Sequence, residues 1–128
     1  MADFPESHRD LLQTPVGVLA TQGADGYPQV SALWFIVDDG TIKLSLNTSR
    51  QKVKNLRRHP ECTLLLMDPA NQYHTMEIRA RAEITQDTES GVMAGVKEKY
   101  GADVREHDRP GEERIAVILH PVKINTWG

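Results

Sequence analysis

The chain has 128 residues, of which 39% are hydrophobic and 26% charged, an ordinary balance for a soluble globular protein. A formal net charge of −3 argues against a general nucleic-acid binder, and no apolar run approaches the ~18 residues of a membrane span. The single cysteine, Cys62, excludes an intrachain disulfide framework and favours a reducing compartment. The N-terminal residues lack the basic and apolar regions of a signal peptide, so we expect a cytoplasmic protein. The length predicts a single domain over residues 1–128.

The first half of the chain predicts a short helix followed by a three-stranded meander. The helix is expected over residues 4–14, because Pro15 disfavours its continuation. Asp38-Asp39-Gly40 is a hairpin signal between the second and third strands. The three strands are expected at Val16–Thr21, Pro28–Val37 and Thr41–Leu46.

The second half predicts two helices and three further strands. The first helix must stop at His59 because Pro60 follows, and the second is expected over Asp87–Tyr100 with Gly101 as its stop. Residues 101–113 are so rich in charge that they predict an exposed, mobile connection. The strands are expected at Cys62–Met67 (buried on both faces), Tyr73–Thr85 and Ile115–Trp127. Six mostly antiparallel strands on so short a chain predict a mainly β (α+β) fold, a small closed barrel rather than an open sheet, with short flanking helices.

The stretch Asn47–Arg58 carries the strongest ligand signal in the sequence. Five of the 15 Lys and Arg residues lie between Arg50 and Arg58, with no acidic residue among them. Positive charge at a helix start opposes the helix dipole, and no acidic partners are spaced to neutralise it. An external anion would resolve the conflict, because free backbone N–H groups and cationic side chains would act on it together. We therefore predict a phosphate site for a nucleotide-like cofactor, the alternative being a solvated helix face.

Other chemistries find little support in the sequence. The five histidines show no metal-ligand spacing, and the one cysteine has no partner for a zinc site, so no metal is expected. The Gly-x-Ser-x-Gly, Walker and Gly-x-Gly-x-x-Gly motifs are absent, which argues against a hydrolase nucleophile and a Rossmann oxidoreductase. Trp34 and Tyr73 are either core aromatics or walls for a flat aromatic ligand.

Four stretches, taken as a set, resemble the pyridoxamine-phosphate-oxidase-like split β-barrel family (the FMN-binding split-barrel type). Within it they are most similar to the FDOR-B type branch, which uses the deazaflavin coenzyme F-420 rather than FMN. The similarity runs from about residue 8 to Trp127. The stretches are Val16–Thr21, Asp25-Gly26-Tyr27-Pro28-Gln29-Val30-Ser31, Ser49-Arg50-Gln51-Lys52-x-x-Asn55-Leu56 and Asn55-Leu56-Arg57-Arg58-His59-Pro60.

The resemblance implies a homodimer with two cofactor sites at the subunit interface, and it assigns cofactor contacts to particular positions. The phosphate-binding segment corresponds to Ser49, Arg50, Gln51 and Lys52. The positions that face the ring are Gln29 and Ser31, and the strand-end positions whose backbone approaches the cofactor are Leu46 and Asn47. The segment that approaches across the dimer runs from Tyr73 to Met76. Lys54 and Arg57 are candidate partners for the anionic oligoglutamate tail of F-420.

The activity implied by the resemblance is transfer of a hydride from F-420H2 to an unsaturated small molecule, such as an enone, a quinone or a tetrapyrrole-like acceptor. The cofactor carries that chemistry, which agrees with the lack of an evident acid–base pair, and no catalytic residue is identified. Two alternatives remain open. One is an FMN-binding oxidoreductase of the same fold, and the other is a non-catalytic cofactor- or haem-binding protein.

Overall fold

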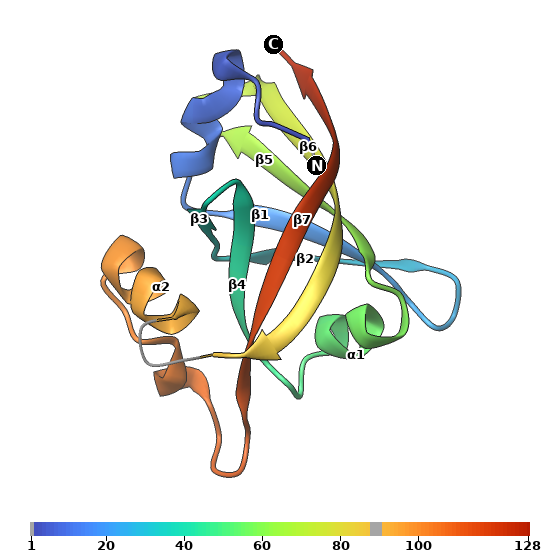
Figure 1. The fold of residues 1–128 in the computed structure, drawn as a ribbon, viewed down its shortest axis with the longest axis vertical. Helices are drawn as coiled ribbons and strands as arrows, with labels where there is room; N and C mark the ends of the chain where they lie inside the picture. Colours follow the sequence, from blue (N-terminus) through green and yellow to red (C-terminus); the bar gives the residue numbers. More distant parts are fainter. Residues whose placement is uncertain (1, 88–90) are drawn as a thin grey trace.

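The computed structural model describes residues 2–87 and 91–128, a strongly curved sheet flanked by short helices (Figure 1). The helices in chain order are η1 (Glu6–Gln13), α1 (Gln51–Arg58), α2 (Val92–Tyr100) and η2 (Val104–His107), where η denotes a 3-10 helix. The strands are β1 (Gly17–Gln22), β2 (Pro28–Leu33), β3 (Ile36–Asp38), β4 (Thr41–Asn47), β5 (Glu61–Asp68), β6 (Asn71–Gln86) and β7 (Arg114–Trp127).

The strands form one seven-stranded antiparallel sheet in the order β2-β1-β5-β6-β7-β4-β3. Its edge strands, β2 and β3, follow one another in the chain and are separated only by Trp34 and Phe35. So short a connection between opposite edges requires the sheet to roll up until they adjoin. The result is a barrel that stays open between β2 and β4, so the closed barrel predicted from the number of strands is corrected to a split barrel.

The predicted number of six strands is wrong, because the expected strand Pro28–Val37 breaks into β2 and β3. At the break, Phe35 is fully buried, while Trp34 is 37% exposed. Two side chains of α2 form the backbone hydrogen bonds that a neighbouring strand would otherwise form. The Phe35 N–H donates to the Tyr100 hydroxyl at 3.1 Å, and Lys99 Nζ donates to the Phe35 carbonyl at 2.9 Å. A strand can be interrupted inside the protein only where such partners exist.

The core lies inside the barrel and corrects one prediction about exposure. The alternate residues Met76, Ile78 and Ala80 of β6 are buried in the core. The strand β5, predicted to be buried on both faces, is not, because Leu65 and Met67 are 38% and 46% exposed. Nothing in the described part of this chain covers the outer face of β5.

Local backbone signals were reliable guides to the boundaries. The β3–β4 hairpin turns at Asp39 and Gly40, which both have positive φ, as the sequence Asp-Asp-Gly predicts. Helix α1 ends at Arg58 with His59 as its C-cap, and α2 ends at Gly101, whose φ of 72° is left-handed. The predicted start of α2 at Asp87 is wrong, because Asp87 precedes the helix and accepts from the Val92 and Met93 N–H groups, and the helix begins at Val92. Residues 88–90 of the predicted helix lie outside the described residues.

The long strand β7 contains Pro121, which has no N–H to give to a ladder. The pairing with β6 steps from Arg79↔Lys123 to Ala80↔Pro121, so Val122 is an extra residue in β7 and forms a bulge there. None of the helices in the described residues is long and apolar enough to cross a membrane.

Candidate functional site

A pocket of about 380 Å³ occupies the opening of the barrel between β2 and β4. These two strands are not neighbours in the sheet order, so their facing side chains are free to line a cavity. The start of α1, one side of α2 and the connection before β7 complete the walls. The lining residues are Ser31, Ala32, Leu33, Trp34, Ser45, Leu46, Asn47, Arg50, Lys52, Val96, Val104 and Arg114.

One side of the pocket is cationic. Arg50 is the N-cap residue of α1, and Lys52 lies in its first turn, which holds no acidic residue and no side-chain cap. Within the described chain, neither cation forms a salt bridge. Burial and the nearby Arg50 both lower the pKa of Lys52 below its ordinary value. Two neighbouring positive charges beside a helix start form an arrangement that an anion would stabilise.

The floor of the pocket holds two hydroxyl groups without partners. Ser31 Oγ of β2 and Ser45 Oγ of β4 are both buried, and neither makes a hydrogen bond to any described residue. An unsatisfied buried hydroxyl costs free energy, so such groups in native proteins usually have a partner or a function. A ligand with hydrogen-bonding groups along one edge would satisfy both.

Trp34 forms an aromatic wall at the same pocket. Its ring stacks on Tyr100 with a centroid distance of 4.3 Å and an interplanar angle of 4°. The Tyr100 hydroxyl is fixed in turn by the Phe35 backbone, so the stack is held in one orientation. Trp34 is therefore not a core residue but a rigid, partly exposed surface that suits a flat ligand.

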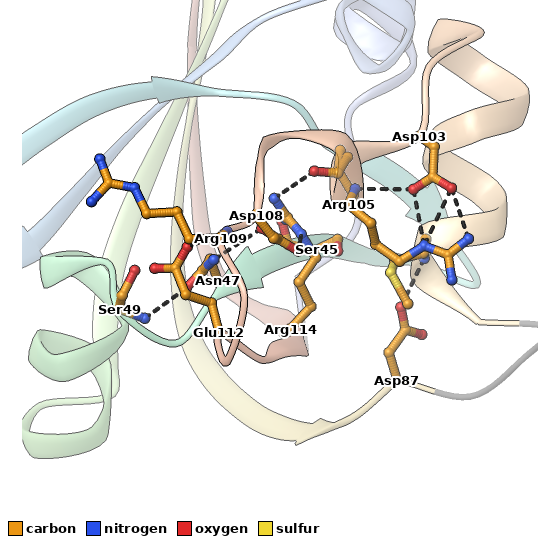
Figure 2. Close-up of polar contacts among 12 residues, drawn as sticks. Ser45, Asn47, Ser49, Asp87, Asp103, Arg105, Asp108, Arg109, Glu112 and Arg114 are labelled. Atoms are coloured by element: carbon orange, nitrogen blue, oxygen red, sulfur yellow. Dashed lines mark hydrogen bonds and ion pairs between the residues drawn. The ribbon is translucent and has the colours of Figure 1, made fainter.

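A polar clamp of Arg114, Asp108 and Asn47 holds the connection between α2 and β7 against the pocket (Figure 2). Arg114 donates to Asp108 at 2.8 Å, to the Ser45 carbonyl at 3.1 Å and to the Val104 carbonyl at 2.9 Å. Asn47 donates to Asp108 at 2.9 Å and accepts from the Ser49 N–H at 2.8 Å. Residues 101–113, predicted to be an exposed, mobile connection, are mostly exposed but include η2, and Val104 among them lines the pocket.

Five of the residues predicted to contact a cofactor lie together in this pocket: Ser31, Leu46, Asn47, Arg50 and Lys52. Leu46 and Asn47 are only 7% and 4% exposed, and the Asn47 amide is engaged in the clamp, so their contribution is mainly through the backbone.

Four further predicted residues lie beside the pocket without lining it. Gln29 accepts a hydrogen bond from Thr21 at 3.1 Å, and Gln51 donates to Asn55 at 2.9 Å. Ser49 and Lys54 are exposed. Ser49 is the largest cause that lowers the pKa of the Glu112 carboxyl below its ordinary value.

Tyr73 and Met76 do not reach the pocket within this chain. They lie near the beginning of β6, beside the C-terminus, where His74 hydrogen-bonds the Gly128 carbonyl at 3.1 Å (Figure 1). Tyr73 is 74% exposed, while Met76 is fully buried in the core. Inward alternation in β6 places the Met76 side chain among core residues of its own chain. The approach of the Tyr73–Met76 segment to a site across the dimer stays a prediction.

Ser45, Arg114, Val96 and Val104 were not foreseen as site residues. Ser45 belongs to the polar face of an alternating strand, which predicts solvent exposure, and the other three come from segments distant in sequence. The one sequence signal that could have identified any of them was the position of Ser45, a polar residue just before the predicted anion-binding stretch.

Other cavities and reactive groups fit a cofactor less well. A larger cavity of about 790 Å³ lies between η1, β3 and α2, but its cation, Lys99, already donates to two backbone carbonyls. Burial raises the pKa of Cys62 to about 12, so its thiol is a poor nucleophile. Within residues 2–87 and 91–128, no three His, Cys, Asp or Glu side chains are grouped to hold a metal ion.

Comparisons with known proteins agree with this fold. The sequence profile described as pyridoxamine 5'-phosphate oxidase matches residues 4–128. By structure, the chain is similar to an F420 reductase, with a TM-score of 0.81, 29% identity, and coverage of 95% of this chain and 98% of the other. It is similar to the conserved hypothetical protein Rv2991 of Mycobacterium tuberculosis, with a TM-score of 0.79, 30% identity, and coverage of 99% and 88%.

A third similar structure, the haem storage protein HutZ of Vibrio cholerae, has a TM-score of 0.79 at 18% identity, with coverage of 99% and 96%. At that identity the likeness concerns the fold alone. No curated protein matches the sequence significantly. The profile match over nearly the whole chain shows that the protein belongs to the pyridoxamine 5'-phosphate oxidase family, with a split-barrel fold.

Proposed function

We propose that the protein is a coenzyme F-420H2-dependent reductase acting on an unsaturated small molecule, such as an enone, a quinone or a tetrapyrrole-like compound. The observation that supports this most directly is the pocket itself, where an aromatic wall meets a cationic pair and two hydroxyls that have no partners among the described residues. These groups suit the phosphate, the polar ring edge and the flat ring of a flavin-like molecule. The similarity to an F420 reductase favours the deazaflavin over FMN.

The residues present fit such a cofactor, which when bound would supply a hydride to the acceptor. Arg50 and Lys52 would hold its phosphate by charge-assisted hydrogen bonds. Ser31 and Ser45 would orient the ring edge, and Trp34 would exclude water from one side of the pocket. The exposed cations Lys54 and Arg57 continue along α1 toward solvent and would receive an anionic tail.

We further propose that the protein acts as a homodimer. The outer-face patch, which consists of Val16, Val18, Val30, Ala32, Leu65 and Met67, is a continuous apolar surface. Its members are joined by the strand pairs Val18↔Ala32 and Val18↔Leu65, and Val30 is 60% exposed. Ala32 belongs to both this patch and the pocket, so a second subunit docked there would cover the pocket mouth. Tyr73 of each chain, exposed on its own, is proposed to approach the other's site.

An FMN-binding oxidoreductase remains the second candidate, because the family profile is that of a pyridoxamine 5'-phosphate oxidase. A non-catalytic binding protein is the third, on the fold shared with the haem storage protein. Calorimetric titration with F-420, FMN and haem separates them. We expect tight F-420 binding and oxidation of F-420H2 by a panel of enones and quinones. Tight FMN binding without F-420 affinity would support the second candidate, and F-420 or haem binding without turnover the third.

The phosphate site is tested by the double substitution Arg50→Ala with Lys52→Ala. Each charge-assisted hydrogen bond contributes ~1.5–3 kcal/mol, so we expect F-420 affinity to fall by about 100-fold or more. Lys97→Ala with Lys123→Ala is the matched control, since it removes the same charge from exposed positions on α2 and β7. Equal affinities for the two double variants would show that the anion does not bind at α1.

A further inference from the structure

A chain of hydrogen bonds connects the edge of the sheet to the helix that carries the two cations. The Thr21 hydroxyl of β1 donates to Gln29 Oε1 of β2 at 3.1 Å and accepts from Asn55 Nδ2 of α1 at 3.0 Å. The other end of the Asn55 amide accepts from Gln51 at 2.9 Å and from Arg58 at 3.3 Å. We call this set the β1–α1 network.

The two central members of the network are buried more deeply than polar groups usually are. Asn55 is 1% exposed and Thr21 is 2% exposed. Each of the hydrogen-bonding groups of the Asn55 side chain has a partner, and the Thr21 hydroxyl both donates and accepts. Buried polar groups stabilise one arrangement only when they are satisfied in this way, and they then specify it sharply. The network therefore fixes geometry as well as stability.

The geometry that it fixes is the rotation of α1 about its own axis. Helix α1 is only eight residues long and packs on the core through two apolar side chains, Val53 and Leu56. Two apolar contacts limit how far the helix lies from the sheet, but they are not directional. Lys52 precedes Asn55 by three residues and so lies on nearly the same face. A rotation of about 20° would move a side-chain tip about 6 Å from the axis by about 2 Å. Misplacement by about 1 Å is enough to impair a binding site.

We propose that Thr21 and Asn55 are positioning residues that hold Arg50 and Lys52 in register with the pocket. Neither touches the pocket, and they act only through α1. This inference rests on the proposed phosphate site. It predicts that loss of the network weakens the grip on a phosphate group while leaving the ring-binding part of the pocket intact.

The experiment compares ligands with and without phosphate on the same ring. FMN and riboflavin differ by the phosphate alone, while F-420 and its deazariboflavin chromophore differ by the phosphate and the anionic tail. For Thr21→Val, which keeps the side-chain shape and removes the hydroxyl, we expect the ratio of the two affinities to fall about tenfold. For Thr21→Ser, which restores the hydroxyl, we expect the ratio of the unaltered protein. Thr41→Val is the matched control, because it removes a similarly buried hydroxyl from the β3–β4 hairpin.

A purely structural role predicts a different result, namely a lower melting temperature with both ligands weakened equally. An unchanged ratio in Thr21→Val would overturn the inference. Gln51→Met gives an independent reading, since Gln51 is exposed and its replacement breaks the network from the helix side without opening the core. A smaller fall in the same ratio is expected, and no fall would count against the inference. If the unaltered protein itself fails to prefer the phosphorylated ligand, the proposed phosphate site fails instead.

Discussion

Lys52 is a half-buried cation next to a second cation, and this placement makes its charge unusually easy to remove. Burial is the larger cause that lowers its pKa from the ordinary 10.5, and repulsion from Arg50 is the smaller. In the unliganded protein, the unfolded state therefore binds more protons between the two pKa values, so this group makes stability rise with pH across that interval. Ligand binding has the opposite sign, because only the ammonium form attracts a phosphate.

The affinity for a phosphorylated ligand should therefore decline on the alkaline side, starting below pH 10.5, where an ordinary lysine would still be charged. The measurement is the F-420 to deazariboflavin affinity ratio as a function of pH, which cancels ionisation of the ring. Lys52→Arg is the control: arginine stays protonated, so its ratio should remain flat to higher pH. Coincident profiles for the two proteins would mean that Lys52 does not contact the phosphate.

For individual residues, the sequence predicted where charge is concentrated, but it did not predict which side chains come close together in the fold. Arg50 and Lys52 were predictable because five cationic residues without an acidic residue lie within nine positions, and this cluster is visible whatever the pairing of the strands. Ser45 and Arg114 were not, because their roles depend on which strand faces which across the barrel opening. The burial of the Met76 side chain was not predictable for the same reason, since the inward direction of β6 depends on its pairing with β5.

Among the elements, the wall formed by residues 101–113 shows how composition can mislead. Its charge and its Pro and Gly content are typical of a mobile connection, but composition does not reveal that Asp108 within it forms a buried ion pair with Arg114, the first residue of β7. Arg114 and Asp108 are 11% and 14% exposed, whereas Arg105 and Asp103 in the same segment are 65% and 23% exposed. Helix α1, by contrast, was predicted correctly because its stop signal, Pro60, is local.

These two ion pairs give a matched comparison. Arg114→Met leaves Asp108 buried without its cation, and we expect the free energy of unfolding to fall by about 3 kcal/mol. Arg105→Met removes an exposed partner and should change it by less than about 1 kcal/mol. Urea unfolding measures both, and hydrogen exchange over residues 103–112 should quicken only in Arg114→Met. Similar losses for the two variants would contradict a special role for the clamp.

For the whole molecule, the sheet order explains why a predicted strand had to break. A barrel whose edges are consecutive strands needs a sharp corner between them, and Trp34 and Phe35 provide it with the help of Tyr100 and Lys99. Antiparallel pairing and the class of fold followed from alternation and turn signals. The corner between β2 and β3 could not be predicted in this way, because its hydrogen-bond partners come from a helix some 65 residues later in the chain.

The outer-face patch gives the test of assembly. Leu65→Glu places a charge at its centre, and we expect the dimer dissociation constant to rise at least about 100-fold, since two copies of the side chain lose their burial. Tyr27→Glu is the control, because Tyr27 is 76% exposed but lies at the β1–β2 turn. Sedimentation velocity should show a monomer for the Leu65→Glu variant and a dimer for both the unaltered protein and the Tyr27→Glu variant. If the unaltered protein is a monomer, the proposed dimer does not form. If the Leu65→Glu variant is still a dimer, the interface lies outside this patch.

The stacked Trp34 also gives the chain a built-in optical reporter. The only other tryptophan, Trp127, ends β7 at the opposite end from Arg114, which lines the pocket, and it is 55% exposed. A flavin-like ring that enters the pocket would lie against the Trp34 indole and quench its fluorescence, while emission from the solvated Trp127 forms a steadier, redder background. Replacing Trp127 with phenylalanine would leave a single-tryptophan protein in which occupancy of one pocket is read directly from ultraviolet emission, without a label.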